Sequence, residues 1–170
     1  MIDFPLSHPY ELGRLGHAGA KVEIAATPEE CARIAAWAGV ESVELFRAGI
    51  ALRRLSSTHF VYEAALDCML VQSCVVTLDP VPSRIERDFK RELVLSEAAS
   101  HAAEPAAVDE DGREEIGSLR YDLAVPLLEE LALAIDPYPR APGVEFQPPA
   151  DAADAPAPAF AVLKQLKPGS

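Results

Sequence analysis

Residues 42–95 read SVELFRAGIALRRLSSTHFVYEAALDCMLVQSCVVTLDPVPSRIERDFKRELVL, and this stretch decides the fold. Apolar and polar residues alternate over much of it, which is typical of strands with one buried face. Strands are predicted over Val43 to Leu55, Phe60 to Leu78 and Ile85 to Leu95, with turns at Ser56–Ser57 and Asp79–Ser83. The second strand is unusually long, so we expect it to bend or to carry a β-bulge. Such long strands favour a curved antiparallel sheet, either a roll or a partial barrel.

Helices are predicted to flank this sheet. Thr27 and Glu30 have the spacing of a capping box, Pro28 suits the first helical position, and Gly39 marks a stop. A second helix is predicted over Val125 to Ile135, with a buried stripe made by Leu127, Leu128, Leu131 and Ile135. Two short strands are expected before the first helix, one starting at Ile2–Leu6 and one over Ala20–Ala25. The predicted class is therefore α+β.

The chain is expected to divide into a body and a tail. Residues 1–143 are predicted to form one α+β domain, in which residues 97–118, rich in alanine and acid, form a mobile acidic loop. Residues 144–170 contain a linker rich in proline and alanine and then a short amphipathic segment. An isolated helix this short is marginal in water, so this flexible tail is expected either to dock on the body or to fold on a partner. Its candidate partner-binding residues are Phe160, Leu163 and Leu166.

The charge of the chain excludes several kinds of partner. The 170 residues include 15 Lys and Arg against 27 Asp and Glu, a formal net charge of -12. Most of the excess lies in residues 92–130, where Arg113 and Arg120 are the only basic residues. This acidity argues against DNA binding and against docking on an anionic membrane. Because we find no secretory signal and no disulfide pattern among the three cysteines, we expect a cytoplasmic protein.

The motifs of the common enzyme classes are missing from the sequence. It contains no nucleophile elbow, no Walker loop, no HExxH and no dinucleotide-binding fingerprint. Its four histidines are scattered, and none has a cysteine or carboxylate at metal-ligand spacing. We therefore predict no catalytic residue, no metal, no cofactor and no enzymatic activity.

Basic residues concentrate on two of the predicted strands. If their side chains gather on one surface, they form a local basic strip that contacts RNA phosphates despite the negative total charge. The alternative is ordinary surface charge balanced by Glu86, Asp88 and Glu92. The candidates for RNA contact are Arg53, Arg54, Arg84, Arg87 and Arg91.

Two blocks of the sequence are distinctive in order and spacing. The first block is residues 72–82, QSCVVTLDPVP. The second starts at Asp122–Leu123 and continues over residues 129–140, EELALAIDPYPR. Together they resemble the YceD family, the large ribosomal RNA subunit accumulation proteins. The closing residues 160–164, FAVLK, resemble the short C-terminal tail of the family. The positions that carry the motif are Cys74, Asp122, Glu129, Glu130, Pro137 and Pro139.

The resemblance implies a non-enzymatic factor that supports accumulation or processing of large-subunit (23S) ribosomal RNA in bacteria. Many members of the family carry a CxxC in the first block and a second cysteine pair after the proline segment, which suggests zinc in them. In this chain Cys74 takes the place of the first cysteine, Thr77 takes the second, and residues 139–143 contain no cysteine. The chain resembles a variant of the family that lacks the cysteine pairs, and no metal is expected.

Two modes of action follow from these observations. In one, the protein binds large-subunit ribosomal RNA or its precursor, a basic ribosomal protein or assembly factor, or both. In the alternative, it is an acidic protein–protein interaction module or a chaperone for a basic partner, without direct RNA contact. The acidic stretch favours the alternative, because negative charge steers and shields basic proteins.

Overall fold

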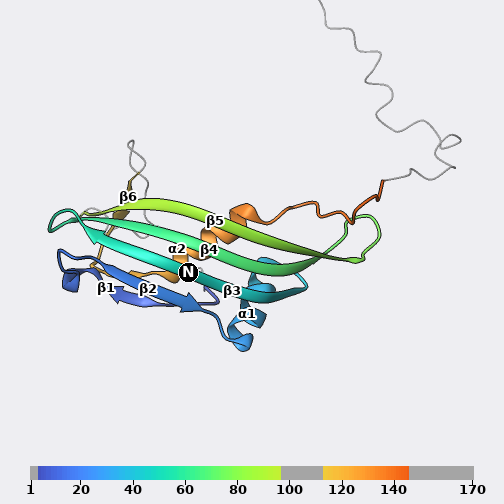
Figure 1. Ribbon diagram of the computed structural model, residues 1–170, viewed down its shortest axis with the longest axis horizontal. Coiled ribbons are helices and arrows are strands. Elements are labelled where there is room, and N and C mark those ends of the chain that lie inside the picture. Colours follow the sequence, from blue (N-terminus) through green and yellow to red (C-terminus); the bar gives the residue numbers. More distant parts are fainter. Residues whose placement is uncertain (1–3, 97–112, 146–170) are drawn as a thin grey trace, which may run out of the picture.

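The computed structural model describes residues 4–96 and 113–145. Its elements, in chain order, are β1 (Pro9–Glu11), the 3-10 helix η1 (Leu12–Arg14), β2 (Ala20–Ala25), α1 (Pro28–Ala38), β3 (Ser42–Arg54), β4 (His59–Ser73), β5 (Pro80–Leu95), β6 (Glu114–Ile116), β7 (Arg120–Asp122) and α2 (Ala124–Ala134). Two helices with two sheets confirm the predicted α+β class (Figure 1).

The larger sheet has the strand order β2-β3-β4-β5-β6, and β1 pairs with β7 in a separate two-stranded sheet. The first four strands of the larger sheet are antiparallel, but β6 runs parallel to β5. The prediction of a wholly antiparallel sheet is therefore wrong, and the sheet is mixed. The error arises within residues 97–118, for which the sequence predicts a loop. Glu114–Ile116 forms a strand there, too short to show an alternating pattern, and residues 97–112 lie outside the described residues.

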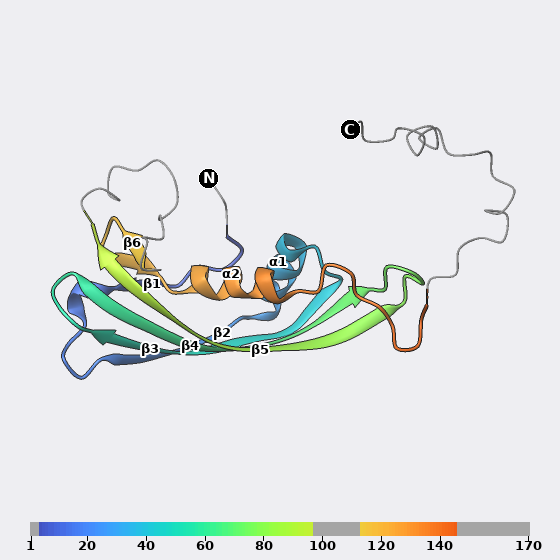
Figure 2. The same ribbon diagram turned by 90° about the horizontal axis from the view of Figure 1, so that it is seen from above.

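The larger sheet is long and curved. Strands β3, β4 and β5 have 13, 15 and 16 residues, and the native twist of such long strands bends the sheet along its length. Figure 2 shows that α1 and α2 lie on its concave side. The expected curvature is present, and the described sheet stays open instead of closing into a barrel.

Strand alternation separates a buried face of this sheet from an open one. On the face that the helices cover, Ile50 pairs with Ala64 and Phe46 pairs with Cys68, and all four are buried. The helix α2 covers this face with four fully buried leucines, Leu123 at its N-cap and Leu127, Leu128 and Leu131 within it. The opposite face carries exposed residues such as Gly49 and Ala65 and most of the charged side chains of the strands. The core is therefore a single layer between sheet and helices.

The start of α1 follows its sequence signals closely. The Thr27 hydroxyl accepts a hydrogen bond from the Glu30 N–H at 3.3 Å, and the Thr27 N–H donates to the Glu30 carboxylate at 2.8 Å. This capping box satisfies two N–H groups that have no partner within the helix. Gly39 ends the helix with φ of 68°, a left-handed conformation that glycine adopts without steric cost.

The turn between β4 and β5 lies earlier than predicted. It is formed by Cys74–Asp79, so β4 ends at Ser73 and Pro80 already pairs with Ser73. The prediction of a turn over Asp79–Ser83 is wrong, because Pro80 and Pro82 belong to β5. Among the described residues, β4 is the only strand paired with this part of β5, since β6 pairs with Leu93–Leu95, and a free edge tolerates proline.

Three further details differ from the predictions. The one register shift in the described ladder of β3 and β4 lies between Val43 and Leu45 of β3, whereas a bend or bulge was expected in the following strand. Phe4–Leu6 forms no strand, and the first strand is instead Pro9–Glu11. The second helix begins at Ala124, one residue before the predicted start.

Neither helix of the described residues is long and apolar enough to cross a lipid bilayer.

Candidate functional site

The two sequence blocks meet at one end of the sheet. The Val75 N–H, in the turn after β4, donates to the Pro139 carbonyl at 2.9 Å. The Gln72 side chain donates to the Asp136 carbonyl at 2.8 Å. The segment that leaves α2, residues 135–145, is thereby attached to the β4–β5 turn, although more than sixty residues separate the two in sequence. We call this end of the molecule the motif junction and define it as residues 72–79 and 136–141.

Cys74 is the central side chain of the motif junction. It is fully buried, and its sulfur accepts a hydrogen bond from the Ala141 N–H at 3.4 Å. The Thr77 hydroxyl and the N–H groups of Ala141, Thr77 and Val76 lower the pKa of the Cys74 thiol to about 6. In contrast, burial raises the pKa of the Cys68 thiol to about 12 and also raises that of Cys31. Cys74 is therefore the cysteine that carries a thiolate near neutral pH.

The motif junction does not fit a zinc ion. Zinc is held by thiolates, imidazoles and carboxylates, commonly four in a structural site. Here the groups around the Cys74 sulfur are backbone N–H groups and one hydroxyl, and none of them is a thiolate, an imidazole or a carboxylate. Within residues 4–96 and 113–145 no three His, Cys, Asp or Glu residues are grouped so that they could hold a metal. Cys74 is therefore an acceptor that organises the turn.

Asp122 joins the start of α2 to the N-terminal segment. Its carboxylate accepts hydrogen bonds from the Ser7 hydroxyl at 2.5 Å, the His8 N–H at 2.7 Å and the Ala124 N–H at 3.0 Å. All three donors belong to this chain, so the carboxylate is occupied within the fold. This motif position supports the architecture directly.

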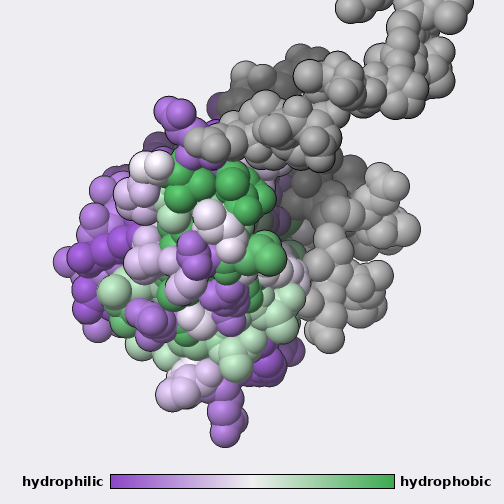
Figure 3. Space-filling model, turned by 90° about the vertical axis from the view of Figure 1, so that its right-hand side faces the viewer, coloured by the Kyte–Doolittle hydropathy of each residue, from purple (hydrophilic) through white to green (hydrophobic). Residues whose placement is uncertain are grey.

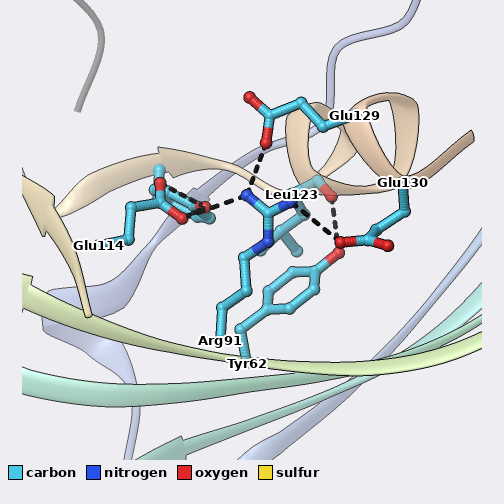
Figure 4. Close-up of polar contacts among 7 residues, drawn as sticks. Tyr62, Arg91, Glu114, Leu123, Glu129 and Glu130 are labelled. Carbon is cyan, nitrogen blue, oxygen red and sulfur yellow. Dashed lines mark hydrogen bonds and ion pairs between the residues drawn. The ribbon is translucent and has the colours of Figure 1, made fainter. Parts of the chain in front are cut away.

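Arg91 lies among three carboxylates beneath α2 (Figure 4). Its guanidinium is 2.5 Å from Glu129, 3.4 Å from Glu130 and 3.4 Å from Glu114. The Arg91 side chain is only 21% exposed. A half-buried cation with this many acceptors is held tightly. Separating it from the carboxylates would leave unpaired charges where water has little access. Arg91 thus ties β5 to both α2 and β6, and Glu129 and Glu130 are two of its anchors.

Two buried tyrosines complete this cluster. The Tyr62 hydroxyl donates to the Leu123 carbonyl at 2.9 Å, and the Tyr121 hydroxyl donates to Glu114 at 2.9 Å. Burial is the main cause that raises the pKa of both phenols, so both remain neutral donors at physiological pH. The two phenol groups of this cluster therefore form hydrogen bonds within the chain.

The five candidate RNA-contact arginines do not gather on one surface. Arg53 and Arg84 lie on the open face of the sheet, whereas Arg91 lies on the face under α2. Arg53 and Arg84 are also far apart, because Arg53 is level with Glu92, and eight residues of β5 span roughly 26 Å. The expected basic strip is therefore not formed by these five residues together.

Acidic neighbours neutralise the arginines of the open face. Arg84 and Arg47 both bind Asp67, at 2.9 Å and 2.7 Å, and these two arginines lower the pKa of Asp67 to about 2. Arg53 binds Glu63 at 2.7 Å. Arg54 and Arg87 lie instead on the helix-covered face, where they pair with the buried residues Phe60 and Leu66. In the described part of the chain no carboxylate lies within ion-pair distance of either.

Sequence reasoning missed several residues of these clusters. Glu114, Tyr62 and Tyr121 were not predicted, although Arg91 has the same strand parity as Ile85 and Phe89, a signal that places it on the helix-covered face. Arg47 was not among the candidates either, yet it shares Asp67 with Arg84. The tail candidates Phe160, Leu163 and Leu166 lie outside the described residues.

Comparison with known proteins identifies the family of this chain. The fold and the site define an acidic α+β protein in which one long open sheet carries two motif blocks joined at its end. Residues 62–167 match the family described as large ribosomal RNA subunit accumulation protein YceD. The chain belongs to the YceD family, and this membership gives it a role in the accumulation of large-subunit ribosomal RNA, a part of ribosome biogenesis. No curated protein and no solved structure matches it.

Proposed function

We propose that this protein supports accumulation of large-subunit (23S) ribosomal RNA without catalysis, by binding a basic ribosomal protein or assembly factor. The observation that carries this proposal is that three of the candidate RNA-contact arginines already form ion pairs within the chain. Arg53, Arg84 and Arg91 are engaged by carboxylates of the same chain. An RNA phosphate would have to displace those carboxylates and would then face the negative charges left behind.

The charge of the whole chain supports a basic partner. With a net charge of -12, the protein attracts proteins rich in lysine and arginine and repels the RNA backbone. Ribosomal proteins must be kept from binding RNA at wrong places before they assemble, and an acidic surface competes with RNA for the same basic side chains. Binding such a protein in this way would protect the RNA indirectly, through correct assembly.

A second candidate function is direct RNA contact through a smaller set of residues. Arg54 and Arg87 are the two candidate arginines without a carboxylate partner in the described structure, and Arg87 is exposed. In this mode, substituting each arginine would reduce the salt dependence of RNA binding by about one unit per phosphate contact. Arg54→Ala and Arg87→Ala test it directly.

The deciding experiment is a pull-down from a bacterial lysate with the tagged full chain, with and without ribonuclease. We expect a basic ribosomal protein or assembly factor to stay bound after nuclease treatment. The double variant Arg53→Ala, Arg84→Ala should retain the same protein, because both arginines serve ion pairs within the open face. Large-subunit RNA that is lost on nuclease treatment, with no protein retained, would contradict the proposal and favour the second candidate.

A further inference from the structure

Three large apolar side chains are exposed together at the motif junction. Val75 is 47% exposed, Leu78 is 76% exposed and Tyr138 is 71% exposed. Val75 and Leu78 belong to the β4–β5 turn, and Tyr138 precedes Pro139, whose carbonyl accepts the hydrogen bond from Val75. We call these three residues the apolar tip. Figure 3 views this end of the molecule and shows hydrophobic surface gathered on it.

The apolar tip is held in one conformation by hydrogen bonds. Within the turn, the Cys74 N–H donates to the Asp79 carbonyl at 2.8 Å and the Leu78 N–H donates to the Cys74 carbonyl at 2.9 Å. The Ala141 N–H and the Cys74 sulfur connect the turn to the neighbouring segment. A surface that is already ordered loses little conformational freedom on binding, which favours affinity.

Leu78 has a backbone conformation that its side chain disfavours. Its φ is 63°, and it is the one residue other than glycine with a positive φ among the described residues. Glycine or asparagine adopts this conformation more readily than leucine. The Leu78 side chain points into solvent and not into the core, so packing within the described structure does not account for a leucine here. A contact outside the chain would account for it.

The charges around the apolar tip indicate the chemistry of that contact. Asp79 and Asp136 are exposed, and neither forms an ion pair with a described residue. Arg140 is the single Lys or Arg residue of the motif junction. An apolar centre with an acidic rim matches a protein surface in which an apolar side chain is flanked by lysine or arginine.

We propose that the apolar tip is the docking surface for the basic protein partner, with Leu78 and Tyr138 as its anchors. This inference rests on the proposed function and adds the place at which the partner binds. The partner inserts an apolar side chain between these anchors, and its cations approach Asp79 and Asp136. The acidic remainder of the chain accelerates the encounter, and the apolar tip provides the specific contact.

The test uses the full chain and RNA-free protein extracted from bacterial large ribosomal subunits. Proteins retained by the wild-type chain are identified and purified, and their dissociation constants are measured for Leu78→Asn, Tyr138→Ser and Leu55→Asn. Leu55 is the matched control, because it is also an exposed leucine, at 56%, but it lies in the turn between β3 and β4 at the other end of the sheet. Thermal unfolding of each variant is measured in parallel.

We expect Leu78→Asn and Tyr138→Ser each to weaken binding about tenfold or more, as loss of an interface anchor does, while Leu55→Asn binds like the wild type. Leu78→Asn should unfold at the same temperature as the wild type or higher, because asparagine tolerates a positive φ. Weaker binding in a variant that is as stable as the wild type cannot be attributed to misfolding.

Other results would overturn the inference in distinguishable ways. If a basic ribosomal protein binds both tip variants as tightly as the wild type, the location is wrong and the proposed function stands. If no ribosomal protein is retained here, and no basic assembly factor stays bound in the nuclease-treated pull-down, the proposed function fails together with the inference. If Tyr138→Ser instead abolishes binding of a large-subunit RNA fragment, or if Leu78→Asn dissolves a dimer seen by light scattering, RNA or a second copy occupies the apolar tip.

Discussion

Several polar side chains of this protein form their hydrogen bonds with other residues of the same chain. Cys74 accepts hydrogen bonds from the turn that contains it and from Ala141, while Asp122 accepts three from two segments of the chain. Both belong to the two blocks on which the resemblance was based, and the contacts described for both lie within the chain. The large apolar residues that face outward at the motif junction are instead Val75, Leu78 and Tyr138. Cys74 and Asp122 therefore stabilise the fold, and the exposed residues of the motif junction form the surface that a partner could contact.

The Cys74 thiol gives a prediction at this scale. Thr77→Val removes the hydroxyl that contributes most to lowering the pKa of Cys74, so this pKa should rise from about 6 toward the ordinary value of 9.0. The ultraviolet absorbance of the thiolate, followed against pH, measures it, and Cys68 and Cys31 do not interfere because their pKa values are raised.

The same shift makes stability depend on pH. Since the pKa of Cys74 is lower in the folded chain than in the unfolded one, its stabilising effect is fully present above about pH 9 and is lost as the pH falls to about 6. Between these values the free energy of unfolding of the wild type should increase with pH more steeply than that of Cys74→Ser. Parallel curves for the two proteins would show that the thiolate is not stabilised by folding.

At the scale of elements, one arginine joins a helix and two strands in addition to the contacts of the core. Helix α2 packs on the sheet through fully buried leucines, but its polar side is attached through Glu129 and Glu130 to Arg91 of β5. The short strand β6 is attached to the same guanidinium through Glu114. Because β6 has only three residues, its ladder hydrogen bonds are few, and it is also held by this ion cluster and by the buried side chain of Ile116.

Removing the guanidinium should therefore loosen both elements. We expect Arg91→Met to lower the free energy of unfolding by about 2–3 kcal/mol, because Glu114 and Glu130 lose their partner in a poorly solvated site and Glu129 loses a close ion pair. Arg84→Met is the control, since its ion pair with Asp67 is half exposed, and the expected loss there is below about 1 kcal/mol. Chemical denaturation of the two variants compares them.

A double variant separates charge from packing in this cluster. Adding Glu129→Gln to Arg91→Met removes one of the repelling carboxylates, so it should recover part of the loss. The effect of Glu129→Gln on the free energy of unfolding is measured in the wild type and in Arg91→Met. If the effect is the same in both, the two residues are not coupled, and the loss in Arg91→Met comes from packing of the arginine stem.

At the scale of the whole molecule, the acidic excess and the apolar tip belong to different parts of the chain. The excess is concentrated in residues 92–130, which begin near the end of β5 farther from the β4–β5 turn, and the apolar tip lies at that turn. Charge acts over about a Debye length of 10 Å at moderate salt, while apolar contact acts only on touching. This separation suits a protein that attracts a partner over distance and then holds it at one place.

Neutralising part of the acidic stretch tests the long-range role. The variant Glu104→Gln, Asp109→Asn, Glu110→Gln, Asp111→Asn keeps the chain length, which matters because a parallel connection from β5 to β6 needs a long crossover. We expect its association rate with the basic partner to fall about two- to tenfold at low salt, with a smaller change in dissociation rate.

High salt provides the comparison for this variant. At about 1 M salt, where charges are screened beyond roughly 3 Å, the association rates of the variant and the wild type should converge. Stopped-flow measurements over a salt series show this directly. A rate difference that does not change with salt would mean that these residues touch the partner instead of steering it.

Local features of this protein were determined by its sequence alone. The capping box of Thr27 and Glu30 and the stop at Gly39 lie within one helix, so their hydrogen bonds depend on neighbouring residues only. The alternating pattern defined β3 and most of β4 and β5 in the same way, because strand periodicity is a property of consecutive residues. The two motif blocks likewise indicated the family, because each is a run of residues recognisable by its order along the chain.

Pairings across the chain were decided only by the tertiary structure. Strand β6 is three residues long and depends on its neighbour β5, so no local pattern could reveal it or its parallel direction. The candidate arginines separated onto two faces, because a change of one residue reverses the direction of a strand side chain. Arg91 met Glu129 across 38 positions, and Cys74 met Ala141 across 67. These contacts depend on the strand register and on the path of the chain. Both result from interactions between segments that are far apart in the sequence.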